Sequence, residues 1–300
     1  MSDVELWNRI LTKNCIELRE YMWGELVLQG YEWPEQKPGQ QDMLRASLLM
    51  HVLLRQHRCV TYICFDMAET VIERYVMWHA VKTGAGGVKR LEYKPNAIDV
   101  VCLIPLTEST SCCEAIASMT NMTLLSISSM YFSNIVVSVI GGYVEQATSL
   151  TELELLHIEA DDTNAGLFLD HLARNRSVKS LIAHELFLLA REGRALADVV
   201  LNHATLEQLH VKGSLHHSPS ALLAAAAHSQ SLRSLTVEES FIDAADIETL
   251  ASALTIPSQP PDCDEEEMRP PPMSRLRKLS FRTCGPFDSE LEAAYAKLIG

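Results

Sequence analysis

The sequence predicts an α/β solenoid, in which short strands alternate with helices and the strands build one parallel sheet. Two observations predict it. The spacing apolar-x-x-apolar-x-apolar occurs eight times, and stretches with a helical spacing of apolar residues follow several of these copies. The chain has 300 residues, of which 47 % are hydrophobic and 21 % charged, so it can bury a sizeable core and is not disordered throughout.

Each copy of the spacing predicts one strand. The first residues of successive copies are separated by 28, 34, 28, 28, 28, 26 and 44 residues, and four intervals of 28 are hard to obtain by chance. The longest interval contains a loop candidate, Pro257–Pro272. The eight copies are Val60-Ile63-Phe65, Val88-Leu91-Tyr93, Met122-Leu125-Ile127, Leu150-Leu153-Leu155, Val178-Leu181-Ala183, Leu206-Leu209-Val211, Leu232-Leu235-Val237 and Leu276-Leu279-Phe281.

Helix start signals follow several of the predicted strands. Asp161 is suited to cap a helix that carries Leu167, Leu169 and Leu172. Ser218 is an N-cap candidate with Pro219 as the first helical residue. Asp243 and Asp288 precede further stretches of helical spacing. Each unit is therefore expected to be a short strand followed by a helix of about three turns.

The first 56 residues lack the strand spacing. Their apolar pattern predicts one helix over Val4–Leu28 and a second over Gln41–Gln56, separated by the turn-rich segment around Pro34 and Pro38. A solenoid has to cover the open end of its first unit, so residues 1–56 are predicted to form an N-terminal helical cap.

The strand–helix period of about 28 residues resembles that of leucine-rich repeats of the ribonuclease-inhibitor-like class, over Arg58–Gly300. The resemblance implies a horseshoe with a parallel concave sheet and outer helices, with about eight units in residues 57–300. The family places Asn or Cys three residues after the third apolar position, where only Asn96 and Cys284 fit. In most units, other groups must therefore form the hydrogen bonds that this side chain gives to the backbone of the turn. An F-box is the alternative reading of residues 1–56, but its Leu-Pro opening is not found.

The segment Pro257–Met273 is rich in proline around Asp262–Glu267, and residues 257–273 are predicted to be a disordered insertion. The alternative is an acidic docking loop. Because the sequence given stops at Gly300, directly after the last predicted helix, we expect the last strand to be an edge that a partner or a further segment covers.

The concave face is the predicted recognition surface, because strand residues between the buried positions point away from the helices. The predicted partner-binding residues contain five acids and five bases, a mixture that suits a protein partner and not a polyanion. They are Tyr62, Asp66, Arg90, Glu92, Lys94, Glu152, Glu154, His184, Gln208, His210, Lys212, Glu238, Lys278 and Arg282.

Metal and nucleotide sites are not expected. His203, His210, His216 and His217 are close in sequence, but they would lie on different surfaces and could not converge on one ion. The glycine-rich run Thr83–Val88 lacks the Lys-Ser/Thr ending of a phosphate loop and precedes a strand, so Gly84 is read as the end of a helix. No cofactor is expected.

These observations predict a non-enzymatic module that binds a protein partner on its concave face. The alternatives are the substrate-recognition or sensor arm of a ubiquitin-ligase adaptor or NOD-like receptor, and a ribonuclease-inhibitor-like binder. The net charge of −14 argues against nucleic acid and anionic membranes, and no small-molecule substrate is expected. No signal peptide is recognised and the eight cysteines form no CxxC pair, so a cytoplasmic or nuclear location is expected.

Overall fold

Ten strands form one open sheet in which each strand pairs with its neighbours in the sequence, in the order β1 to β10. The computed structural model describes residues 2–30, 39–65, 71–94, 106–213, 219–240, 242, 244–254, 275–283 and 294. The strands are β1 Ile16–Met22, β2 Glu25–Gly30, β3 Val60–Phe65, β4 Arg90–Tyr93, β5 Leu124–Ser128, β6 Glu152–Leu156, β7 Ser180–His184, β8 Gln208–Lys212, β9 Ser234–Ser240 and β10 Lys278–Thr283.

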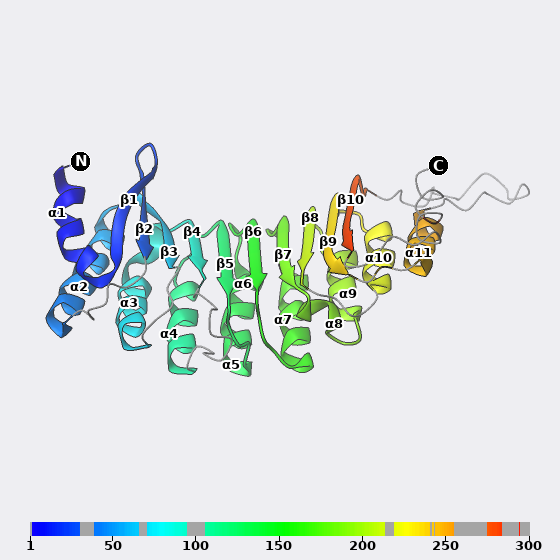
Figure 1. Cartoon of the computed structure of the whole chain (residues 1–300), viewed down its shortest axis with the longest axis horizontal. Coiled ribbons are helices and arrows are strands. Elements are labelled where there is room, and N and C mark those ends of the chain that lie inside the picture. The colour runs from blue at the N-terminus through cyan, green and yellow to red at the C-terminus, as the bar shows by residue number, and fades with distance from the viewer. Residues whose placement is uncertain are drawn as a thin grey trace, which may run out of the picture.

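Helices cover one face of the sheet, and all of them except α1, which precedes β1, lie between successive parallel strands (Figure 1). They are α1 Ser2–Leu11, α2 Gln40–Gln56, α3 Val71–Gly84, α4 Leu106–Ala117, α5 Asn134–Val136, α6 Gly142–Gln146, α7 Asp162–Arg174, α8 Leu186–Leu189, α9 Arg194–Asn202, α10 Ser220–His228 and α11 Ala244–Leu254. A π-helical turn, Val137–Gly141, joins α5 to α6. The mixed α/β fold is confirmed, and strands β3 to β10 lie at the eight positions that the spacing predicts.

The strand register places equivalent apolar residues of neighbouring strands side by side. Leu125 pairs with Leu153, Leu153 with Leu181, and Leu181 with Leu209. Each of these leucines is at most 1 % exposed, so they form one buried row between the sheet and the helices. This arrangement is compatible with a solenoid, and the assignment to leucine-rich repeats stays a prediction.

Aromatic side chains fill the wider parts of the core. The Trp78 ring lies between Phe65 and Tyr93, with ring centroids 5.4 and 5.2 Å away. The Phe132 and Phe168 rings are tilted against each other with their centroids 5.2 Å apart, and the Phe168 centroid lies 5.7 Å from that of Phe187. Edge-to-face and tilted pairs of this kind add packing energy to the burial of the rings.

The predicted helix over Val4–Leu28 is wrong beyond Leu11. The chain turns at Cys15, which has φ 56°, and then forms the antiparallel hairpin β1–β2. Ile16 and Leu18 are buried and alternate with more exposed residues, which is the period of a strand. Gly24, at φ 79°, forms the tight turn. Residues 1–56 are thus a mixture of helix and hairpin, and the second helix is found at Gln40–Gln56.

The helix signals are confirmed in part. Asp161 caps α7, since its Oδ1 accepts the Asn164 N–H at 2.7 Å. α3 ends at Gly84 as expected. Pro219 is the N-cap of α10 and not its first residue, and Ser218 lies outside the described residues. The insertion at residues 257–273, Asn96, Asp243, Cys284 and Asp288 also lie outside them.

Candidate functional site

The face of the sheet opposite the helices carries the predicted recognition residues. Burial alternates along β3, β4 and β7, so that the residues between the buried positions lie on the open face. The central strand β5 differs, because all five of its residues are buried and Ser126 has no exposed surface. Glu154 of the neighbouring strand β6 contacts Ser126 here.

A hydrogen-bonded network links four strands across the first half of the open face. Tyr62 on β3 donates its hydroxyl to Glu92 Oε1 at 2.6 Å, and Lys94 Nζ donates to Glu92 Oε2 at 2.7 Å. Lys94 also lies 3.9 Å from Glu154 Oε2 on β6, which accepts the Ser126 hydroxyl at 2.8 Å. These contacts hold the five side chains in one arrangement before any partner arrives.

The protonation states of this network follow from its contacts. Burial raises the pKa of Glu92, but the hydrogen bonds from Lys94 and Tyr62 outweigh it, so the pKa lies below the ordinary value. Burial lowers the pKa of Lys94, whereas its bond to Glu92 and the charges of Glu92 and Glu154 raise it above the ordinary value. Burial, followed by the bond to Glu92, raises the pKa of Tyr62. At neutral pH, Glu92 and Lys94 therefore form an ion pair and Tyr62 remains a donor.

An aromatic pair with an arginine above it extends this network to the hairpin. The Tyr21 and Tyr62 rings meet edge to face at 5.1 Å. The Arg90 guanidinium lies 5.6 Å from the Tyr21 centroid and 5.5 Å from that of Tyr62. Both distances are in the range of cation–π attraction. The sequence-based prediction missed Tyr21 because it placed this residue in a helix.

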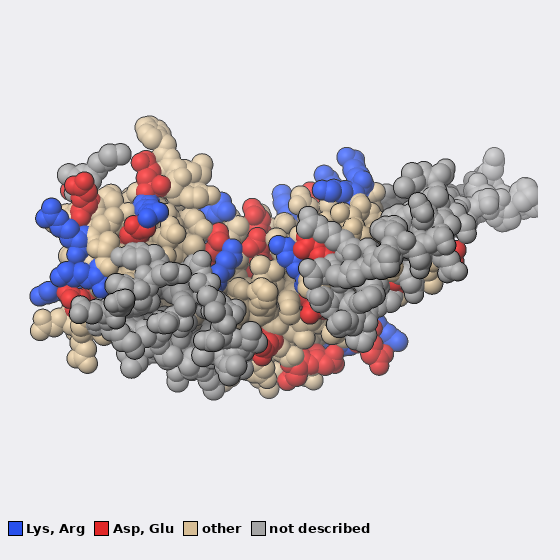
Figure 2. Space-filling view, in the orientation of Figure 1, with Lys and Arg blue, Asp and Glu red and all other residues tan. Residues whose placement is uncertain are grey.

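The tip of the hairpin exposes large apolar side chains. Trp23 is 99 % exposed, Met22 59 % and Tyr21 43 %. The hairpin stands clear of the rest of the sheet edge in Figure 1. It is an uncharged projection in Figure 2, where acidic and basic side chains alternate along the same edge of the molecule. Tryptophan, tyrosine and arginine are the residues that most often dominate binding energy at protein interfaces.

The predicted histidines lie on the second half of the open face. His210 Nε2 lies 3.1 Å from Glu238 Oε1, although without the geometry of a hydrogen bond. His184 lies at the end of β7, and burial and the nearby His157 lower its pKa, which a backbone hydrogen bond to Ile158 partly offsets. The His157 and His184 ring centroids are 6.0 Å apart.

Within the described part of the chain, the remaining predicted residues make no contact with these clusters through a side-chain hydrogen bond, ion pair or ring contact. Glu152, Gln208 and Lys278 are exposed, and Lys212 is half-buried at the end of β8. Arg282 lies on β10, but its side chain is outside the description, and Asp66 lies outside the described residues. The structure thus joins Tyr62, Arg90, Glu92, Lys94 and Glu154 into one site. The partner-binding role of the whole set stays a prediction.

The residues that the structure describes hold no group of three His, Cys, Asp or Glu side chains that could bind a metal ion. None of the helices described above combines the length and the apolar character that crossing a membrane requires. Models of known protein families give no match to the chain, and no curated protein matches it either.

Proposed function

We propose that this chain is a leucine-rich-repeat protein whose open sheet face binds a protein partner, and that it is not an enzyme. The register of leucines 28 residues apart on β5 to β8 supports the repeat assignment. A parallel sheet with helices on one face leaves the other face free for recognition.

The observation that carries the proposal is the joined surface of the hairpin tip and the network. Trp23 and Tyr21 offer exposed aromatic area next to Arg90, while Tyr62 and Lys94 are already held by Glu92. A large apolar anchor beside fixed polar groups is the composition of a protein–protein hot spot. Binding such a surface costs little side-chain entropy because most of its groups are ordered beforehand.

The charge arrangement favours a protein over a polyanion. Lys94 is engaged with Glu92 and Glu154, and Lys89 with Glu25 at 3.0 Å, so these bases are already neutralised by neighbours. We further propose that the protein acts in the cytoplasm or nucleus. The five described cysteines form no disulfide, which suits a reducing compartment.

The test is quantitative affinity purification of the full chain followed by mass spectrometry. Trp23→Ala and the double variant Glu152→Ala/Lys212→Ala change the proposed surface at exposed or half-buried positions, so the fold is retained. Leu167→Ala and Asp198→Ala/Arg55→Ala are matched controls on exposed helix positions.

We expect at least one protein whose recovery falls about tenfold or more in both surface variants and not in the controls, the effect of losing roughly 1.4 kcal/mol of binding energy. Equal recovery of every copurifying protein by surface and control variants would contradict the proposal. Catalytic turnover of any copurifying protein would contradict its non-enzymatic part.

A further inference from the structure

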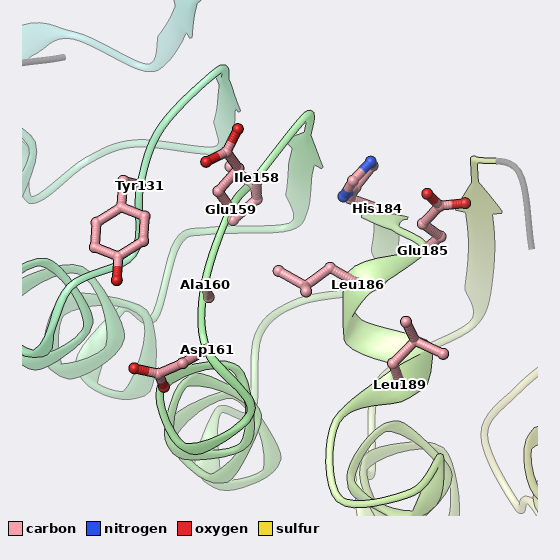
Figure 3. Close-up of a pocket in the computed structure, with 9 residues that line it drawn as sticks. All are labelled: Tyr131, Ile158, Glu159, Ala160, Asp161, His184, Glu185, Leu186 and Leu189. Carbon is pink, nitrogen blue, oxygen red and sulfur yellow. The ribbon is translucent and has the colours of Figure 1, made fainter. Parts of the chain in front are cut away.

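A groove of about 490 Å³ lies where β6 and β7 end, beyond the open-face network. One side is the extended segment from Ile158 to Asp161, and the other is His184, Glu185 and the short helix α8. Tyr131, from the segment after β5, also lines the groove and lies on the side of residues 158–161 away from α8 (Figure 3).

The groove exists because two neighbouring connections leave the sheet differently. After β6 the chain stays extended and pairs with the segment before it, since Phe132 N–H donates to Glu159 O at 2.7 Å and Glu159 N–H to Met130 O at 3.0 Å. After β7 the chain enters α8 at once, and then turns through the left-handed residues Arg191 and Glu192. Because one connection is extended and the other is helical, the two diverge and leave a groove between them.

The walls of the groove are largely apolar. Leu186 of α8 projects toward the segment that carries Ala160 (Figure 3), and Leu189 of the same helix also lines the groove. Ile158 is 1 % exposed and forms part of the opposite wall, whereas Leu189 remains 40 % exposed. An exposed leucine at such a wall gains from contact with the carbon chain of an incoming side chain.

Acidic groups line the same groove. Glu159 is exposed and makes no ion pair with any residue within the described ranges. Asp161 makes no ion pair within the described ranges, and its carboxylate, the N-cap of α7, accepts from the backbone and side-chain amides of Asn164 at 2.7 and 2.9 Å. The Arg191 guanidinium is committed to Asp170 by two hydrogen bonds of 2.8 and 2.6 Å. His184 adds no positive charge at neutral pH, because burial lowers its pKa.

We propose that this groove binds an arginine side chain of a protein partner, an inference that rests on the proposed function and gives it a chemical specificity. Arginine combines a carbon chain, which packs on Leu186 and Leu189, with a flat cation that lies against apolar and aromatic groups such as Tyr131. The edge of the guanidinium carries five N–H donors, which can reach separate carboxylates such as Glu159 and Asp161.

The experiment is a titration of the full chain, labelled at isoleucine and leucine methyls, with N-acetyl-arginine amide. The control ligand is N-acetyl-citrulline amide, which has the same shape without the charge. We expect methyl shifts concentrated on Ile158, Leu186 and Leu189, and about fivefold or more larger for arginine than for citrulline. The exposed methyls of Leu48 on α2 serve as the reference.

Two charge-neutral variants make the test specific to the groove. Glu159→Gln changes an exposed residue, and Asp161→Asn keeps a side-chain oxygen that can cap α7. We expect each to reduce the arginine shifts at least about threefold, and Asp198→Asn, on α9, to leave them unchanged. Equal shifts with arginine and citrulline, or shifts that survive both groove variants, would overturn the inference. The titration contains no partner protein, so its failure leaves the open-face proposal standing, and failure of the purification test leaves this result standing.

Discussion

His203 takes, in the turn before β8, the place that Asn175 takes in the turn before β7. The two residues are 28 positions apart, and each is at most 1 % exposed. Asn175 Oδ1 accepts the N–H groups of Ser177 and Val178, both at 2.8 Å. His203 Nδ1 accepts the Thr205 N–H at 3.4 Å.

Ser229 continues the series before β9, since its Oγ accepts the N–H of Ser231 at 3.4 Å and of Leu232 at 3.2 Å. A buried polar side chain therefore satisfies the amide groups of three successive helix-to-strand turns. These groups would otherwise be buried without partners, which is costly.

Replacing Asn175 by alanine is expected to destabilise the fold by about 3 kcal/mol, because it leaves buried backbone groups unpaired. The Asn175 side-chain amide also donates to Val144 O at 2.6 Å and to Ala147 O at 3.1 Å. Urea denaturation followed by circular dichroism measures the change. Asn202→Ala, at an exposed position of α9, is the control and is expected to cost under about 1 kcal/mol. Equal losses in the two variants would refute the role given to Asn175.

Acid is expected to weaken the fold through His203. Burial, and secondarily the charge of Arg176, lowers the pKa of His203 from 6.5 to about 4. Between these values the unfolded chain binds a proton that the folded chain does not, so stability falls as the pH is lowered from 6.5 and this contribution levels off below about 4. The full effect is roughly 3 kcal/mol.

The check is urea denaturation at a series of pH values for the native chain and for His203→Asn, which introduces the residue used by the preceding turn. The variant retains every other titrating group. Its stability should depend less steeply on pH between 4 and 6.5. Parallel pH profiles for the two proteins would show that His203 is not the group responsible.

Removing the Tyr62 hydroxyl is expected to cost about 2 kcal/mol, since it donates to a charged acceptor, Glu92. Tyr62→Phe should also raise the pKa of Glu92, because one of the bonds that lowers it is lost. Carboxyl titration by NMR measures this shift, and thermal unfolding measures the stability. Tyr131→Phe, at an exposed ring, is the control. A Glu92 pKa that stays unchanged in Tyr62→Phe would contradict the network.

The buried thiols are expected to resist alkylation in the folded protein. Burial raises the pKa of Cys15 to about 11 and that of Cys113 to about 12, so neither is a thiolate near pH 8. Cys59 is less buried than these two. Iodoacetamide labelling at pH 8 with peptide mapping should therefore modify Cys59 well before Cys15 and Cys113. Labelling at similar rates would mean that the core opens on the timescale of the reaction.

The strands were predictable because their buried positions are set by local spacing. Leu153, Leu181 and Leu209 are separated by 28 residues each, and this spacing alone is enough to predict that they form a buried row. The hairpin was missed because Leu6, Ile10, Leu18 and Leu26 also fit a helical spacing. The alternation around Ile16 and Leu18, and the glycine at position 24, were the signals that identify strands and a turn.

The candidate site was predictable only as a set of positions. That Tyr62 and Glu92 share a face follows from the two-residue period, but their contact depends on the register between β3 and β4. The place of Tyr21 depends on an antiparallel pairing that the sequence pattern concealed. The groove beside α8 depends on how two loops diverge, which no spacing of residues encodes.

The strict order of the sheet, in which every strand bonds only to strands adjacent in the sequence, has a consequence for folding. Each strand pairs with a strand that is near in the sequence, so the loop that has to close at each step is short and its entropy cost is low. Assembly can therefore spread outward from whichever strands pair first. The fully buried strand β5, together with its neighbour β6, is the natural starting point. Opening under stress is expected to begin at β10, whose apolar residues Leu279 and Phe281 are only partly buried, and to proceed strand by strand toward the middle.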